Sequence, residues 1–265
     1  TELFADVIVN AANTAATGDI LITADTGATI VKEKGWSYIA PGKVTGVTPN
    51  RGQVGSLVVI AGENLRGGGS GVSQVTLGGV VAGIMSESDT EIKLKVYPGK
   101  KVGKGDVVVT SKNGAYIVLQ DGFEYLDQGD INDVSPSSGQ YGTKVSITGT
   151  AMLGGGKKIT SLTLAGITVK QILKATDTLI EVVVEVDTTS SARNGDVVIQ
   201  TDTGAIIKRL GGWRYLQQGK VTTVTPNLGQ IGTSVEIGGV RMLGGGKKIT
   251  SVKLGNTAAS IESST

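Results

Sequence analysis

The sequence predicts an all-β protein made of tandem β-sandwiches, and three observations carry this prediction. Glycine supplies 41 of the 265 residues and aromatic residues only 4%, a composition that fits many short strands joined by tight turns. Segments such as 145–149 and 235–239 alternate apolar and polar side chains, as half-buried strands do, and no window keeps a helical period. The same pattern also returns along the chain, starting at Gly42, Gly129 and Gly219.

Each repeat opens with a strand that ends in a proline turn. The turn has the form Val-x-Pro-x-x-Gly, and its proline stands at the end of the strand, where a missing N–H is tolerated. A second strand follows and ends in glycine, and a glycine-rich turn then leads into a third strand. The prolines are Pro49, Pro136 and Pro226, and the strand-ending glycines are Gly62, Gly149 and Gly239.

Each repeat closes with a hairpin. Gly-Asp dipeptides precede the apolar runs of the closing strands and indicate entry from a turn into a strand. Asn113-Gly114 is a strong hairpin signal, and Thr203-Gly204 and Thr26-Gly27 hold the same place. About seven short strands fit each period, which is the size of an immunoglobulin-like sandwich.

These features resemble the IPT/TIG domain family, which has the same proline turn, the same glycine-ended strand and a closing Gly-aromatic-x-Tyr strand. The resemblance recurs in every repeat and implies immunoglobulin-like sandwiches. Because one sandwich fold hosts many roles, it implies less about function. In amylase-like enzymes such modules accompany a separate catalytic domain. The matching turns are 47–52, 134–139 and 224–229, and the closing motifs are 35–38, 122–125 and 212–215.

The repeat boundaries predict two complete sandwiches, 42–128 and 129–218, between two half-repeats. Residues 1–41 match the second half of a repeat, and residues 219–265 match the first half. Ser264-Thr265 followed by Thr1-Glu2-Leu3 also aligns with residues 88–92. Three explanations stay open: a window cut from a longer tandem protein, subunits whose halves complete each other head to tail, or arbitrary ends. The clean match at the seam counts against arbitrary ends.

A half-sandwich has a bare apolar face and an open edge, and it is too small to be stable alone. We therefore expect the two kinds of half to meet, either within a longer chain or between chains. Deleting residues 1–10 should then abolish assembly. The candidate self-assembly residues are Leu3, Phe4, Val7, Val9, Val252, Leu254 and Ile261.

Composition removes most chemical functions. The chain has no cysteine and no histidine, which excludes disulfides, thiolate or imidazole metal sites and Ser-His-Asp or Cys-His catalysis. The net charge is +2 and the lysines are spread out, so no nucleic-acid partner is predicted. No stretch of 18 apolar residues predicts a membrane span. We expect a protein that is not an enzyme and has no catalytic residue, cofactor or metal.

Three local patterns have a functional and a structural interpretation. The Gly-Gly-Gly-Lys-Lys segments 154–158 and 244–248 fail the phosphate-loop pattern and favour solvated turns, with a weak contact to an acidic polysaccharide as the alternative. Aspartates could cap turns or bind calcium between domains. The recurrent aromatic residues could pack at the domain end or form a carbohydrate platform. The aspartates are Asp130 and Asp133, and Asp202 near Asp196; the aromatics are Trp36, Trp213, Phe123 and their partner tyrosines.

The leading functional hypothesis is a structural extracellular protein that forms a fibre, filament or cell-surface stalk by head-to-tail stacking of sandwiches. Its partner would be a homo-oligomer or a continuous tandem chain, with a polysaccharide or glycan as a further candidate. The alternative is a ligand-binding ectodomain fragment of an adhesin or receptor, as the resemblance implies for plexin-like receptors, with the divergent loop 66–73 as its weak hint. A Rel-like dimerisation domain is the third reading, and salt-sensitive DNA binding would distinguish it.

Overall fold

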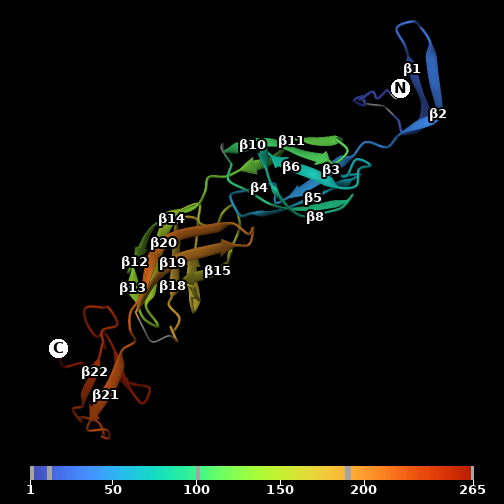
Figure 1. The fold of residues 1–265 in the computed structure, drawn as a ribbon. Coiled ribbons are helices and arrows are strands. Elements are labelled where there is room, and N and C mark those ends of the chain that lie inside the picture. Colours follow the sequence, from blue (N-terminus) through green and yellow to red (C-terminus); the bar gives the residue numbers. More distant parts are fainter. Residues whose placement is uncertain (1–2, 11–13, 100–101, 189–191, 264–265) are drawn as a thin grey trace. The chain divides into compact units, whose positions relative to one another are not determined.

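A computed structural model of the chain describes residues 3–10, 14–99, 102–188 and 192–263 (Figure 1). Within these ranges every regular element is a β-strand, as predicted. Among the same residues there is no helix long and apolar enough to cross a membrane. The chain forms two compact units, one of residues 1–50 and 58–125 (unit 1) and one of residues 51–57 and 126–265 (unit 2).

Residues 42–128 fold into two facing sheets, and their core is built from alternate strand residues. Ile60, Leu77, Ile92 and Phe123 all belong to one fully buried cluster. The first sheet has the order β3 (Lys43–Thr48), β5 (Leu57–Glu63), β9 (Glu91–Lys95), β8 (Gly83–Glu87). The second has the order β4 (Arg51–Gly52), β11 (Tyr116–Tyr125), β10 (Gly103–Ser111), β6 (Val72–Leu77), β7 (Val80–Val81).

Residues 129–218 repeat this arrangement strand for strand. Their buried cluster includes Ile147, Leu164, Ile180 and Trp213. The four-stranded sheet has the order β12 (Asp130–Ser135), β14 (Lys144–Thr150), β18 (Leu179–Val183), β17 (Gln171–Ala175). The five-stranded sheet has the order β13 (Ser138–Gly139), β20 (Ile206–Tyr215), β19 (Arg193–Thr201), β15 (Ile159–Leu164), β16 (Ile167–Thr168). Each repeat thus has seven longer strands, as predicted, plus two strands of two residues.

The remaining segments form only two-stranded sheets. β1 (Ala16–Thr23) pairs with β2 (Thr29–Tyr38), β21 (Lys220–Thr225) with β22 (Glu236–Val240), and β23 (Val252–Leu254) with β24 (Thr257–Ala259). No described residue of 1–41 or 219–265 belongs to the buried hydrophobic core. The seam between Ser264-Thr265 and Thr1-Glu2 lies outside the described residues. The fold class is therefore confirmed: immunoglobulin-like sandwiches flanked by pieces of the same pattern.

One local prediction needs correction. The Gly-Asp dipeptides lie inside the closing strands rather than at their entry, because each marks a β-bulge. The aspartate carboxylate accepts a backbone N–H from a partner-strand residue with positive φ, and this bond holds the bulge. The bonds join Asp19 to Lys34 at 2.7 Å, Asp106 to Asp121 at 2.9 Å and Asp196 to Gly211 at 2.9 Å.

The hairpin at Asn113-Gly114 forms where predicted, and its loop extends beyond this dipeptide. Thr110 pairs with Tyr116, and the Ser111 N–H donates to the Ala115 carbonyl at 2.8 Å, so the loop closes outside the dipeptide. Gly114 has a φ of 88°, a conformation that glycine adopts without strain. The Asn113 side chain also accepts the Ala115 N–H, which adds a local bond to the turn.

Candidate self-assembly surface

Large hydrophobic side chains are exposed mainly in the two half-repeats. Of those that are solvent-exposed, thirteen lie in residues 1–41 and eight in 219–265, against seven in 42–128 and five in 129–218. The halves are also the shorter segments, so the excess per residue is larger still. An excess of exposed large hydrophobic side chains in one part of a chain is expected at an interaction site.

The register of the complete repeats explains what the N-terminal residues lack. Leu3 aligns with Ile92 of β9, and Val7 aligns with Val96 just after that strand; both counterparts are fully buried. Leu3 is instead 94% exposed and Val7 82% exposed. Residues 3–10 form no strand, whereas β9 and β18 at the aligned place are inner strands of their sheets. The missing environment is therefore a pair of flanking strands.

Phe4 and Val9 are exposed as well, but the register gives them different positions. Phe4 aligns with Lys93, which faces solvent between two buried neighbours of β9. Val9 aligns with Val186, which lies beyond the end of β18 and is exposed. These two residues stay predictions for assembly, with Phe4 on the outer side of a completed sheet.

The C-terminal candidates lack neighbouring strands that their counterparts in the complete repeats have. Val252 and Leu254 align with Leu162 and Leu164, both buried in β15 next to the closing strand β19. Ile261 aligns with Ile84, which packs against the core of its repeat. Here β23 pairs only with β24, and Leu254 and Ile261 are exposed.

The sequence-based list missed the strongest apolar surface in the N-terminal half, which lies on the β1–β2 hairpin. Ile20, Ile22 and Trp36 are exposed, although their counterparts in the complete repeats are buried. The hairpin is nevertheless well formed, with Trp36 and Tyr38 in an edge-to-face pair at 5.9 Å. Equivalent pairs join Phe123 to Tyr125 and Trp213 to Tyr215 inside the cores. Alignment with the buried closing strands could have identified these residues.

Comparison with known proteins agrees with this geometry. The profile of the IPT/TIG domain matches residues 43–125 and 130–211, more than half of the chain. The chain belongs to the IPT/TIG domain family. No protein of curated function matches it.

Among solved structures, the chain is similar to a plexin region and to bacterial glycan-utilization proteins. The full extracellular region of plexin A4 is 17% identical, with 72% of this chain and 17% of that chain covered and a TM-score of 0.46. SGBP-B from a complex xyloglucan utilization locus in Bacteroides uniformis is 16% identical, with 65% and 49% covered and a TM-score of 0.28. SGBP-B of the Bacteroides ovatus mixed-linkage glucan utilization locus, in complex with a mixed-linkage heptasaccharide, is 14% identical, with 79% and 55% covered and a TM-score of 0.29. The chain thus spans a small part of the plexin region and about half of each glycan-utilization protein.

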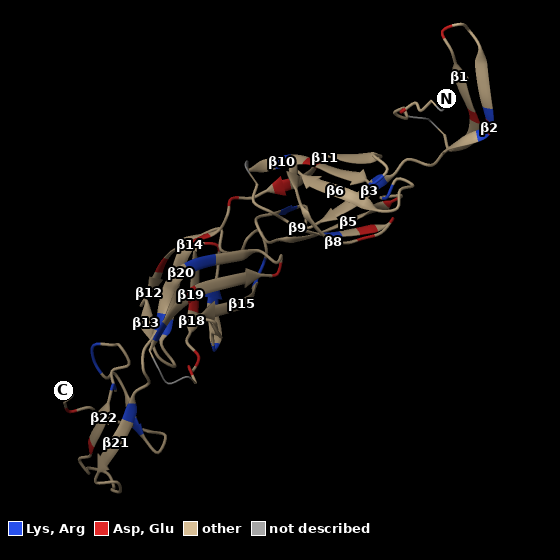
Figure 2. Cartoon of the chain, viewed as in Figure 1, with Lys and Arg blue, Asp and Glu red and all other residues tan. Residues whose placement is uncertain are grey.

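Charges in this IPT/TIG chain are dispersed. Figure 2 shows Lys and Arg interspersed with Asp and Glu over the described strands and loops. In the first Gly-Gly-Gly-Lys-Lys segment, Lys157 and Lys158 are exposed, and the Lys157 N–H is held by the Asp202 carboxylate at 3.0 Å. This arrangement is that of an anchored, solvated turn.

Three of the four aspartates considered for calcium, all except Asp133, are engaged in local bonds. Asp130 accepts the next backbone N–H at 2.9 Å, and Asp202 caps the lysine turn. Asp196 forms an ion pair with Lys208 at 2.8 Å, and this contact, with the Gly211 N–H, lowers the pKa of Asp196. Among the described residues, no three or more carboxylates gather where a metal ion could be held. The geometry is that of turn and bulge capping.

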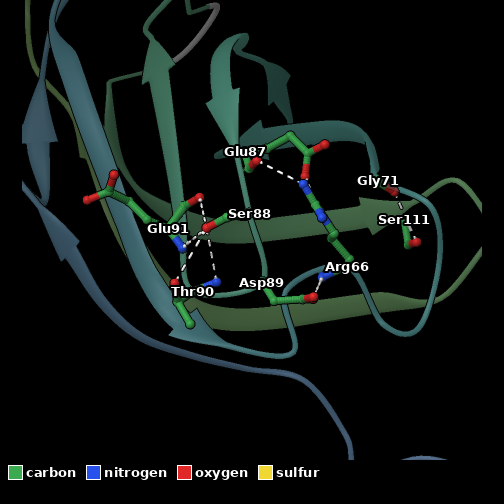
Figure 3. A network of polar contacts seen from close by, with 8 residues as sticks. All are labelled: Arg66, Gly71, Glu87, Ser88, Asp89, Thr90, Glu91 and Ser111. Atoms are coloured by element: carbon green, nitrogen blue, oxygen red, sulfur yellow. Dashed lines mark hydrogen bonds and ion pairs between the residues drawn. The ribbon is translucent and has the colours of Figure 1, made fainter.

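The divergent loop 66–73 is fixed by an internal polar network (Figure 3). Arg66 Nε contacts Glu87 Oε2 at 2.7 Å, and the Arg66 N–H donates to Asp89 at 3.0 Å. The hydrogen bond to Glu87 raises the pKa of Arg66 above its ordinary value. In the next repeat Leu153 replaces the arginine and keeps the same backbone bond, to Asp177. The polar groups that distinguish this loop therefore bind each other.

Proposed function

We propose that this chain is a structural, non-enzymatic tandem-repeat protein whose half-repeats complete each other between copies. Head-to-tail joining in this way gives a fibre, filament or cell-surface stalk, and an extracellular or cell-surface location is part of the proposal. The observation that carries it is the burial contrast: positions that are core in 42–128 and 129–218 are exposed in both halves.

The complete repeats also specify how the halves would pair. In repeat 129–218, Ile147 of β14 lies opposite Ile180 of β18. By alignment, Ile237 of β22 would lie opposite Leu3 of another copy. Residues 2–7 would then enter as the inner strand beside β22, which is a case of strand addition.

The other sheet would be completed by the hairpin. Leu164 of β15 lies opposite Val197 of β19, and the aligned pair is Leu254 opposite Ile20. The apolar faces of β1 and β2 would then cover those of β21 and β22, as in an intact sandwich. Each half lacks the strands that the other carries, so the contact is heterologous and propagates along a fibre.

A cross-linking experiment tests the pairing. Because the chain has no native cysteine, only the introduced cysteines can form disulfides. Ser146 lies opposite Glu181, so the aligned residues Glu236 and Phe4 would face each other. We expect a Phe4→Cys chain mixed with a Glu236→Cys chain to form disulfide-linked heterodimers, because opposed Cβ atoms lie within disulfide range. Monomeric chains, or a disulfide that forms only inside a chain carrying both substitutions, would contradict the proposal.

Electron microscopy supplies the second test. The wild-type chain should form filaments with an axial repeat of about 100 Å, from strands of about 20 Å per domain plus turns. Deleting residues 1–10, or Leu3→Asp, should abolish them, because a charge would enter the completed core. Met85→Asp, on an exposed residue of the edge strand β8, is the matched control and should leave filaments intact. Ligand-binding monomers would favour the ectodomain alternative.

A further inference from the structure

A glutamine turn recurs in all three repeat openings. Each turn follows the proline turn and reads Gln-x-Gly-Ser/Thr, with a central glycine of positive φ. The hydroxyl at the fourth position accepts the glutamine N–H at 3.2, 3.1 and 3.0 Å, so the three turns share one conformation. The glutamines are Gln53, Gln140 and Gln230.

Two of these glutamines hold the first residue of the repeat that follows. Gln53 and Gly129 both lie in unit 2, and the Gly129 N–H donates to Gln53 Oε1. The Gly219 N–H donates to Gln140 Oε1 at 2.7 Å in the same way. Gln53 is only 1% exposed, which makes this a buried hydrogen bond.

The glycine-rich loop of the following repeat packs against the other side of the glutamine side chain. A Cβ on Gly154 would lie 2.6 Å from Gln53 Nε2, and a Cβ on Gly244 would lie 2.6 Å from Gln140 Nε2. Both glycines also have positive φ. Side chains are therefore excluded there, and the glutamine amide lies directly on the loop backbone.

Gln230 has the same turn but a different environment. Its backbone bonds to Thr233 are formed, yet its side chain is exposed and makes no hydrogen bond among the described residues. An acceptor held in a preformed turn is thus left facing solvent.

The groups that would contact the Gln230 side chain lie in unit 1, at the opening of repeat 42–128. The Asn64 carbonyl lies against Gly42 in the same way as the Ala151 carbonyl lies against Gly129. The Gly42 N–H, however, has no acceptor among the described residues. Gly67 aligns with Gly154 and also has positive φ. A Cβ on Gly67 would meet Ala115, and no glutamine lies within 4 Å.

We propose that Gln230 of one copy accepts the Gly42 N–H of a second copy and seats its amide against Gly67. This inference rests on the head-to-tail assembly proposed above and identifies the contact that locks each joint. The partner is another copy of this chain, because its Gly42 and Gly67 reproduce the surroundings that Gln53 and Gln140 already occupy.

The test compares full-length wild type, Gln230→Ala and the matched variant Gln140→Ala. Sedimentation should show about tenfold weaker association for Gln230→Ala, as expected for one lost buried hydrogen bond. Gln140→Ala should associate like wild type. Hydrogen exchange should show the Gly42 amide protected only in assembled wild type, while Gly129 stays protected in the Gln230→Ala chain, which confirms that this variant is folded.

The outcomes separate the two proposals. If wild type assembles but Gln230→Ala assembles equally well and Gly42 exchanges freely, the glutamine contact is wrong and the head-to-tail assembly stands. If wild type shows no association at any concentration, both are wrong. Weaker assembly of Gln230→Ala with loss of Gly42 protection supports both.

Discussion

The closing hairpin of repeat 129–218 and the N-terminal hairpin share a register but differ in burial. Gly195 pairs with Trp213 in β19–β20, and Gly18 pairs with Trp36 in β1–β2, with a bulge at the same place. Their aromatic pairs have nearly the same geometry, at 5.7 and 5.9 Å. Yet Trp213 is 1% exposed and Trp36 43%. A hairpin thus forms from local sequence, whereas its burial needs the opposing sheet.

The largest expected effect tests this contrast directly. Trp213→Ala should lower the free energy of unfolding by about 3–5 kcal/mol, since it empties a fully packed core position. Trp36→Ala should cost less than about 1 kcal/mol in the unassembled chain, because the indole already contacts water. Denaturant unfolding of both variants at a concentration below assembly is the measurement. Equal losses would show that the N-terminal hairpin has a core of its own.

The second prediction concerns alkaline pH. Burial, with a smaller contribution from Asp187, raises the pKa of Tyr215 to about 12 from an ordinary value near 10. Unfolded Tyr215 ionises first, so the stability contributed by its neutral form is present below about pH 10 and is lost as pH rises to about 12. The loss should reach about 2 kcal/mol.

Unfolding measured by urea between pH 9 and 12 checks this dependence. Tyr215→Phe should flatten the profile, whereas Tyr38→Phe, on the half-exposed counterpart, should follow wild type. A Tyr215→Phe chain with an unchanged profile would mean that another group controls alkaline unfolding.

The smallest loss of stability is expected at the Gly-Asp bulge, a feature that the N-terminal half and the complete repeats share. Asp106→Ala removes the acceptor that holds the bulge of β10 and should cost about 1 kcal/mol, a midpoint shift of about 2–8 °C. Asp106→Asn keeps an acceptor oxygen and should recover most of the loss. Calorimetry of both variants is the measurement, and identical losses for Ala and Asn would argue against the hydrogen bond.

Local patterns in the sequence accounted for most of the fold. Apolar alternation located the strands, and the repeated proline turns set the boundaries from which the sandwich followed. The Gly-Asp bulge was misread, because a bulge depends on the partner strand: the Asp106 acceptor is recognisable only when Asp121 is opposite it.

The candidate surface was only partly accessible to sequence reasoning. Leu3 and Val7 were identified from their apolar character, and their aligned counterparts in the complete repeat 42–128 are buried. The same register separates Phe4, whose counterpart Lys93 faces solvent. The glutamine turns drew no attention, because glutamine has no characteristic strand or site pattern and its role depends on a glycine N–H 76 residues away.

The sequence by itself determined that this protein is all-β, repetitive, and without histidine or cysteine chemistry, since composition and period-two alternation act within a few residues. Tertiary structure decided which apolar faces are covered, which aspartates hold bulges and which glutamines bind the next repeat. The physical reason is range: strands and turns are selected by neighbours along the chain, whereas burial and buried hydrogen bonds require partners brought together by folding.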